Sequence, residues 1–133
     1  MVFQLDSRLE ADSHLVAETE DYQLRLIDQS LVPWLIIVPN TDQTEWTALE
    51  GELEQAVNAL VKRCATLLEQ AFAVDKLNVA AIGNVVSQLH IHVVGRYRND
   101  PFWPGVIWGQ PMTRYDKDAL AERISEIQRG LGL

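Results

Sequence analysis

The chain has 133 residues, of which 47% are hydrophobic and 23% are charged, a balance typical of an ordinary globular protein. Eleven Lys and Arg residues against nineteen Asp and Glu residues give a net charge of −8, which disfavours nucleic acid or an anionic membrane surface as the main partner. The single cysteine, Cys64, excludes an intrachain disulfide and a multi-cysteine zinc site. No secretory signal or membrane span is visible, so we expect a cytoplasmic location.

Two strands are predicted in the first third of the chain. Residues 21–29, DYQLRLIDQ, alternate apolar and polar side chains, which indicates a half-buried strand. Residues 34–39, WLIIVP, form a continuous apolar run that ends in proline, which indicates a strand buried on both faces. The segment from Asn40 to Gln43 has the residue pattern of a helix N-terminus, and we expect a helix to begin there.

The clearest helical pattern extends from Trp46 to Ala71, where apolar residues recur every three or four positions in one stripe. An unbroken helix of this length would run ~39 Å, whereas a strand of six residues spans only ~20 Å. One small sheet cannot cover the whole stripe. We therefore expect either a second subunit or the C-terminal tail to complete the cover.

The second half of the chain begins with two further strands. Residues 76–83, KLNVAAIG, have the pattern of a strand, and Gly83–Asn84 that of a turn. Residues 87–96 follow as a strand in which Gln88, His90 and His92 share one face, opposite three apolar side chains.

The tail differs in composition. Residues 99–111 hold three of the five prolines together with Trp103 and Trp108, and we expect them to be irregular. The two tryptophans either pack onto their own sheet or reach the cleft of a partner subunit. A last helix is predicted from Asp116 to about Gly130. The order of strands, long helix, strands and tail helix predicts an antiparallel α+β fold.

His90 and His92 are the candidate functional residues, with Cα atoms ~6.5–7 Å apart along the predicted strand. Three interpretations stay open from the residues alone. The rings are structural and hydrogen-bonded within a sheet, or they carry phosphoryl or acid–base chemistry, or they bind a metal. A metal would need further ligands, and none lies nearby in the sequence.

The segment GNVVSQLHIHVVGR resembles the signature of the histidine triad (HIT) family, Gly–Gln–x–Val–x–His–φ–His–φ–His–φ–φ. Asn84 takes the place of the family's glutamine, and Gln88 that of the first histidine. His90 falls on the nucleophile and His92 on the last histidine. The likeness covers about residues 22–96.

The resemblance implies one HIT-like domain over residues 1–133, with the motif-bearing core at 22–96 and an irregular tail and C-terminal helix at 97–133. Its fold would be a five-stranded antiparallel sheet with helices on one face, and two subunits would form a homodimer with a continuous sheet. The implied activity is hydrolysis or transfer at the α-phosphate of a nucleoside polyphosphate, dinucleoside polyphosphate or phosphoramidate, through a nucleotidyl-histidine. No cofactor or metal is implied.

The same resemblance assigns roles to individual residues. His90 attacks phosphorus, and His92 donates a hydrogen bond to a non-bridging oxygen. Asn84 donates its amide to the same phosphate. Asp28 binds the ribose hydroxyls, unless it only starts a turn, and Arg96 binds a distal phosphate, unless it is only a solvated arginine at a strand end.

Three positions depart from the family pattern. Gln88 cannot act as a nucleophile, so we interpret it as a catalytic-site support that fixes a ring or a loop by neutral hydrogen bonds. Trp34 stands where many members have a histidine, which we expect to remove a polar support. Val85 replaces a Ser or Thr near the leaving group. Two alternatives to an enzyme therefore stay open: a nucleotide-binding module with weakened or lost catalysis because of Gln88, and a metal-binding protein.

The two remaining candidates are interpreted as structural. His14 is expected at the surface, among polar residues near the N-terminus. Cys64 lies on the apolar helix stripe and is expected in the core.

Overall fold

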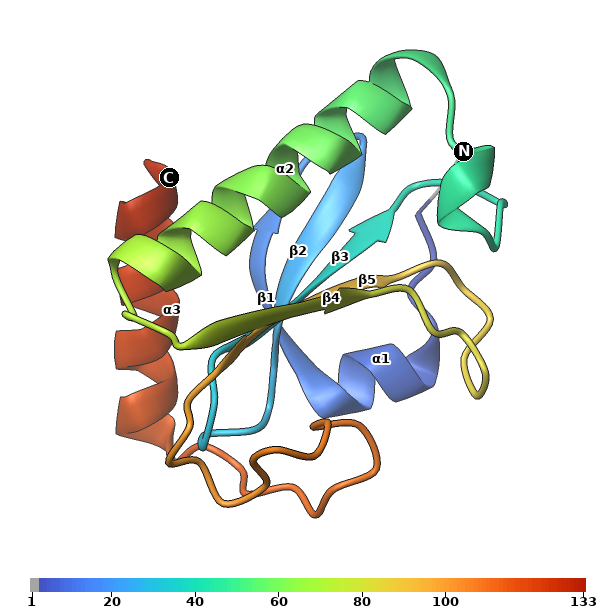
Figure 1. The fold of residues 1–133 in the computed structure, drawn as a ribbon. Helices are drawn as coiled ribbons and strands as arrows, with labels where there is room; N and C mark the ends of the chain where they lie inside the picture. The colour runs from blue at the N-terminus through green and yellow to red at the C-terminus, as the bar shows by residue number, and fades with distance from the viewer. Residues whose placement is uncertain (1–2) are drawn as a thin grey trace.

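A computed structural model describes residues 3–133, and its sheet has five strands in the order β1-β2-β3-β5-β4 (Figure 1). Every neighbouring pair is antiparallel, as predicted. The strands are β1 (Ser13–Glu18), β2 (Tyr22–Ile27), β3 (Trp34–Pro39), β4 (Lys76–Ala80) and β5 (Ile91–Arg96).

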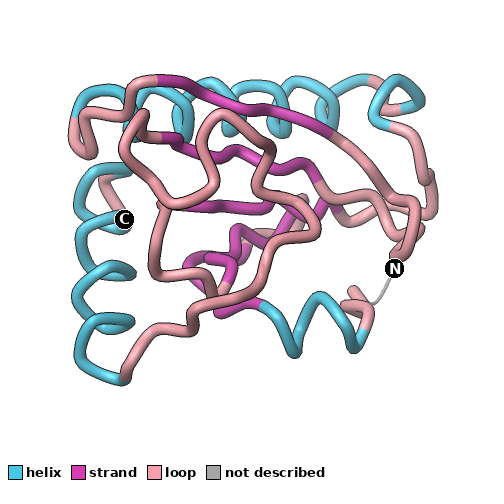
Figure 2. Tube along the Cα trace, turned by 60° about the horizontal axis from the view of Figure 1, so that its bottom comes forward, coloured by secondary structure: helices cyan, strands magenta, loops and turns pink. Residues whose placement is uncertain are grey.

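Helices lie on both faces of this sheet. They are α1 (Ser7–Asp12), the short 3₁₀ helix η1 (Trp46–Ala48), α2 (Gly51–Gln70) and α3 (Lys117–Leu131). α2 and α3 cover one face, while α1 and the loop 97–116 lie on the other, where Figure 2 shows the loop crossing the strands. The expectation of helices on one face only was therefore wrong. No helix among residues 3–133 is both long and apolar enough to span a bilayer.

The two central strands explain why both faces are covered. All six residues of β3 and all six of β5 are buried. Leu35 and Ile37 of β3 pack into the core beneath α2 and α3, whereas Ile36 and Val38 pack into a second core beneath α1 and the tail loop. Because strand side chains alternate, His92 lies on the same face of β5 as Val94, which belongs to the second core.

The helix predicted to begin at Asn40 does not begin there. The Asn40 side chain donates to the Glu20 carbonyl and so ties the end of β3 to the β1–β2 turn instead of capping a helix. The chain then forms η1, and α2 starts only at Gly51, which has φ +61°. The strand predicted from Ser87 likewise starts at Ile91, so residues 87–90 lead into it as a loop.

The tail helix is where it was predicted. The Asp116 side chain accepts a hydrogen bond from the Ala119 amide at the N-cap, and Gly132 ends the helix in the left-handed region. Ile127 and Leu131 of α3 belong to the same core as the α2 stripe. The C-terminal tail thus covers part of that stripe, and the stripe gives no independent support for a second subunit.

A buried ion pair holds the start of the tail loop. The Arg96 side chain is 2% exposed, and its Nε and Nη2 donate to the Asp100 carboxylate at 2.8 and 3.0 Å. Its Nη1 donates to the Gly105 carbonyl at 2.7 Å. Burial alone would raise the pKa of Asp100, but the hydrogen bonds from Arg96 and from the loop amides outweigh it and lower the pKa.

We predict that Asp100→Asn lowers the free energy of unfolding by about 3–5 kcal/mol at pH 7, because the Arg96 charge stays buried without its partner. Because the pKa of Asp100 is lower in the folded protein, its carboxylate stabilises the fold at pH values above the ordinary pKa of an aspartate. This stability is lost as the pH falls through the lowered pKa of the folded state. Urea denaturation at pH 7 and at acidic pH measures both effects. Asp75→Asn, an exposed carboxylate that accepts from the Arg98 amide, is the matched control. An Asp100→Asn protein as stable as this control would contradict the prediction.

Candidate functional site

A cavity of about 430 Å³ opens between the sheet, α1, the loop before β5 and the tail loop. A larger hollow of about 630 Å³ lies between α2 and α3, but none of the predicted site residues reaches it. The smaller cavity is lined by Arg8, Leu9, Asp12, Ile27, Trp34, residues 82–86, His90, His92, Trp108, Gly109 and Met112. It therefore brings together His90, His92 and Asn84 of the predicted set.

His90 sits in the last position before β5 and is 8% exposed. Its Nδ1 lies 2.7 Å from the backbone carbonyl oxygen of Gln88. A carbonyl only accepts, so Nδ1 must carry the proton in this hydrogen bond. In the neutral ring the lone pair is then on Nε2, which is left for a ligand in the cavity.

His92 is 6% exposed, and its Nδ1 accepts a hydrogen bond of 3.0 Å from the indole Nε1–H of Trp34. The rings of His90 and His92 stand 4.8 Å apart between centroids. Burial, with a smaller contribution from His90, lowers the pKa of His92 to about 3, so this ring is neutral at physiological pH. The expectation that Trp34 removes a polar support was wrong, because its indole N–H takes over that function.

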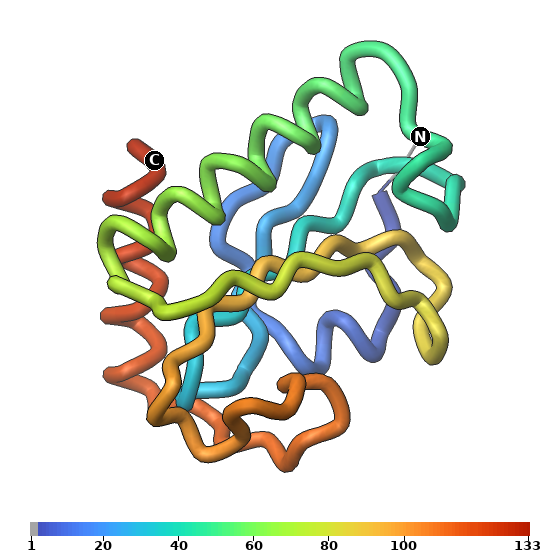
Figure 3. Tube along the Cα trace, in the orientation of Figure 1, coloured from blue at the N-terminus to red at the C-terminus, as the bar shows by residue number. Residues whose placement is uncertain are grey.

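Gln88 is tied to the N-terminal segment. Its Oε1 accepts from the Asp6 amide at 2.8 Å, and its Nε2 donates to the Gln4 carbonyl at 2.9 Å. Figure 3 shows the dark-blue N-terminal trace beside the yellow loop that precedes β5. The side chain does not line the cavity. Gln88 thus supports His90 through its backbone carbonyl and supports the N-terminal segment through its side chain.

The predicted turn at Gly83–Asn84 forms one rim of the cavity. Gly83 has φ +67°, a conformation that favours glycine, and the exposed Asn84 follows it. Arg8 of α1 donates from Nη1 to the Val85 carbonyl at 3.1 Å, which joins this rim to the N-terminal helix. Asn84 can therefore present its amide to a ligand at the cavity mouth.

Asp28 lies at the end of β2 but outside the cavity lining. Its carboxylate accepts from Arg114 Nη1 at 2.8 Å and from the Tyr115 amide at 3.0 Å, and His14 Nε2 lies 3.4 Å away. Burial alone would raise its pKa, but these contacts together lower it. Asp28 thus fastens the tail loop to the sheet, and His14 is a half-buried neighbour of Asp28 rather than a plain surface residue.

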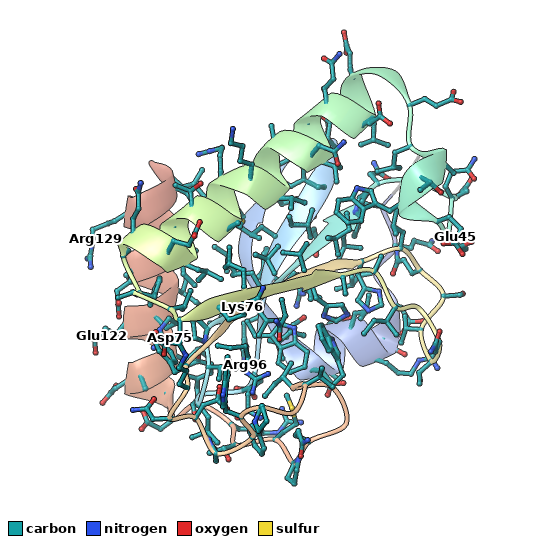
Figure 4. All side chains as sticks on the ribbon, viewed as in Figure 1. Glu45, Asp75, Lys76, Arg96, Glu122 and Arg129 are labelled. Atoms are coloured by element: carbon teal, nitrogen blue, oxygen red, sulfur yellow. The ribbon has the colours of Figure 1, made fainter. Side chains whose placement is uncertain are left out.

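Arg96 is likewise not brought to the cavity. Although it shares a face with His92, its guanidinium is directed to Asp100 and Gly105 between the sheet and the tail loop (Figure 4). It is not the solvated strand-end arginine that was the alternative, since it is one of the most deeply buried side chains. Cys64 is in the core as expected, and burial raises the pKa of its thiol to about 12.

Several lining residues were not predicted. Arg8, Leu9 and Asp12 come from α1, and the Asp6 side chain that caps this helix was the available sequence signal. Trp108 comes from the tail, and its ring lies 5.4 Å from His92 and 6.2 Å from Trp34. Of the two alternatives for the tail tryptophans, Trp108 therefore packs on its own sheet. Over residues 3–133, no three His, Cys, Asp or Glu side chains gather into a potential metal site.

Solved structures of bacterial histidine triad proteins are similar to this chain over nearly its whole length. One from Marinobacter aquaeolei is 36% identical, with a TM-score of 0.91 and coverage of 98% of this chain and 96% of its own. Another from Sinorhizobium meliloti is 32% identical, with a TM-score of 0.90 and coverage of 96% of both chains. A third from Bradyrhizobium japonicum is 30% identical, with a TM-score of 0.90 and coverage of 96% and 97%. A comparison with curated proteins gave no match.

The sequence also matches the HIT domain family over residues 8–99, a range that includes all of α1 except Ser7, all five strands and α2. The three structures share the overall fold of this chain, which includes β5 with His92 and the loop that ends at His90. The chain belongs to the histidine triad (HIT) family.

Proposed function

We propose that the protein is a nucleotide hydrolase or transferase that cleaves at the α-phosphate of a nucleotide and forms a nucleotidyl intermediate on His90. Family membership supports nucleotide chemistry in general. The observation that carries the assignment is the 2.7 Å contact of His90 Nδ1 with the Gln88 carbonyl, which leaves the Nε2 lone pair for attack.

In the first half of the proposed reaction, Nε2 of His90 forms a bond to the α-phosphorus as the bond to the leaving group breaks. Negative charge then grows on the non-bridging oxygens, and His92 lies beside His90 as a neutral N–H donor to one of them. A preorganised donor of this kind contributes ~3 kcal/mol to the transition state. Asn84 supplies a second donor from the rim.

In the second half, water or another acceptor attacks the same phosphorus and the bond to His90 breaks, which returns the lone pair to Nε2. The Gln88 carbonyl stabilises the positive charge that the imidazole ring carries while it is bonded to phosphorus. A small nucleotide is thus the proposed partner, with neither nucleic acid nor membrane involved, and we propose a cytoplasmic location.

We further propose that the protein acts as a homodimer that joins its sheets through β4. This strand is an edge of the sheet, and Val79 within it is 40% exposed. An unpaired, partly apolar edge is a template for pairing with another strand. We expect sedimentation at micromolar concentration to give a dimer and Val79→Lys to shift the protein toward monomer. A monomeric wild-type protein would contradict this proposal.

We predict that His90→Ala folds normally but loses at least ~10³-fold in turnover, the scale for removing an attacking group. The matched control is His14→Ala. His14 is the one histidine of the three that does not line the cavity, so this variant should keep a rate close to that of the wild type. Steady-state assays on adenosine and guanosine polyphosphates measure the rates. Mass spectrometry of the trapped intermediate locates the adduct, and an adduct on a residue other than His90 would refute the mechanism.

We predict that Gln88→His changes turnover by about tenfold or less, because the side chain makes only two neutral hydrogen bonds and the backbone carbonyl is retained. Gln88→Ala should cost more, since the N-terminal segment that leads into the cavity wall loses both bonds, but far less than His90→Ala. Ser87→Ala, an exposed neighbour, is the control. A thousandfold rise in Gln88→His from a baseline near zero would instead favour the nucleotide-binding module.

A further inference from the structure

Trp34 determines which nitrogen of His92 carries the proton. An indole N–H is a donor only and cannot accept, so the nitrogen that faces it must be unprotonated. Because Trp34 donates to Nδ1 of His92 at 3.0 Å, the neutral ring must carry its proton on Nε2. Both side chains are only 6% exposed, so water does not readily replace this bond.

The same bond opposes a second proton on His92. Protonation of Nδ1 would place two N–H groups against each other in a buried site, and one of them would lose its partner. The lowered pKa of His92, which follows from its burial and from His90, agrees with this geometry. His92 is therefore a hydrogen-bond donor that keeps its proton, and it is not a general acid at neutral pH.

The other ionisable groups on the cavity lining are Arg8 and Asp12 of α1 and His90. Arginine does not release its proton in proteins. Asp12 faces the Arg114 guanidinium, whose Nη2 lies 3.8 Å from its Oδ1, so its carboxylate is placed as an acceptor. His90 uses the lone pair of Nε2 for the attack, and its remaining proton stays on Nδ1, which donates to the Gln88 carbonyl. Among the described lining residues, none of these groups is arranged to pass a proton to a leaving group.

We propose that Trp34 is a positioning residue that holds His92 as a neutral donor, and that the cavity therefore favours phosphoanhydrides over phosphoramidates. The leaving group of a phosphoanhydride departs as an oxyanion and needs no proton. The amine of a phosphoramidate must be protonated as it leaves. This inference rests on the proposed function, because it concerns the leaving group in the attack by His90. It narrows the substrate class to nucleoside and dinucleoside polyphosphates.

The bonding changes require no proton in the anhydride case. Nε2 of His90 gives its electron pair to the α-phosphorus, and the pair of the breaking P–O bond remains on the departing phosphate oxygen. Water later adds its oxygen to phosphorus and releases its proton to solvent. In a phosphoramidate the pair of the breaking P–N bond must capture one proton in the same step, and a missing general acid costs about 10²–10⁴-fold in rate.

The experiment compares kcat/KM for diadenosine triphosphate and adenosine 5′-phosphoramidate, together with their guanosine counterparts. For the wild type we expect kcat/KM for the anhydride with the preferred base to exceed kcat/KM for the phosphoramidate with the same base by at least about 100-fold.

Trp34→Phe removes the donor to His92 and should lower kcat on the anhydride at least about tenfold, since a wrong tautomer disables a catalytic ring. Trp34→His restores a ring N–H that can also relay protons, so it should recover anhydride turnover and narrow the ratio. Trp46→Phe, which loses an indole bond to Asn58 far from the cavity, should behave as the wild type.

A readout independent of activity is the ¹⁵N NMR spectrum of the His92 ring in the wild type. We expect the Nε2–H tautomer, with no titration between pH 5 and pH 8, the range in which an ordinary histidine changes charge. An Nδ1–H tautomer or a titration near neutrality would overturn the role of Trp34. Equal kcat/KM for both substrate classes with an adduct on His90 would overturn the leaving-group preference alone. Cleavage of neither class, with no adduct, would overturn the proposed function and the preference together.

Discussion

The central strand pair β3 and β5 is buried on both faces, and this burial constrains every polar side chain placed on it. A buried polar group must find a hydrogen-bond partner or destabilise the fold. His92 finds the Trp34 indole, and Arg96 finds Asp100 in the tail loop. The need to hydrogen-bond these buried groups therefore fixes His92 in the cavity wall and attaches the tail loop to the sheet. The tail loop in turn contributes Trp108 to the cavity.

Two neighbouring histidines are made chemically different by what faces their Nδ1 atoms. A backbone carbonyl faces His90 and requires a proton there, whereas an indole N–H faces His92 and forbids one. One ring thus presents a lone pair to the cavity and the other presents a donor. The carbonyl belongs to the main chain of Gln88, so this part of the arrangement does not depend on which side chain occupies that position.

The features that were predictable from the sequence are those with local patterns. The apolar run of β3, the α2 stripe and the Asp116 cap each have a periodicity or a capping residue that acts over a few neighbours. The motif likewise placed His90, His92 and Asn84 at one cavity. The helix expected at Asn40 failed because its side chain is used in a contact with a residue twenty positions earlier in the sequence.

The side-chain partners that were missed depend on tertiary structure. Arg96 and Asp28 are polar residues at strand ends, where solvent or ligand are natural partners, and only the folded tail loop supplies Asp100 and Arg114 instead. The partner of Trp34 lies 58 positions away, so its donor role is not visible in the sequence around it. The α1 wall was missed because a helix of six residues has too short a pattern to distinguish from a turn.

The double attachment of the Gln88 side chain to Gln4 and Asp6 has an evolutionary consequence. A glutamine side chain at this position can form both hydrogen bonds only where an N-terminal segment lies alongside it. Among relatives, the identity of this residue and the presence of that segment should then be inherited together. The residue at the position of Gln88, the first of the triad, would then depend on the structure of the N-terminal segment rather than on the reaction.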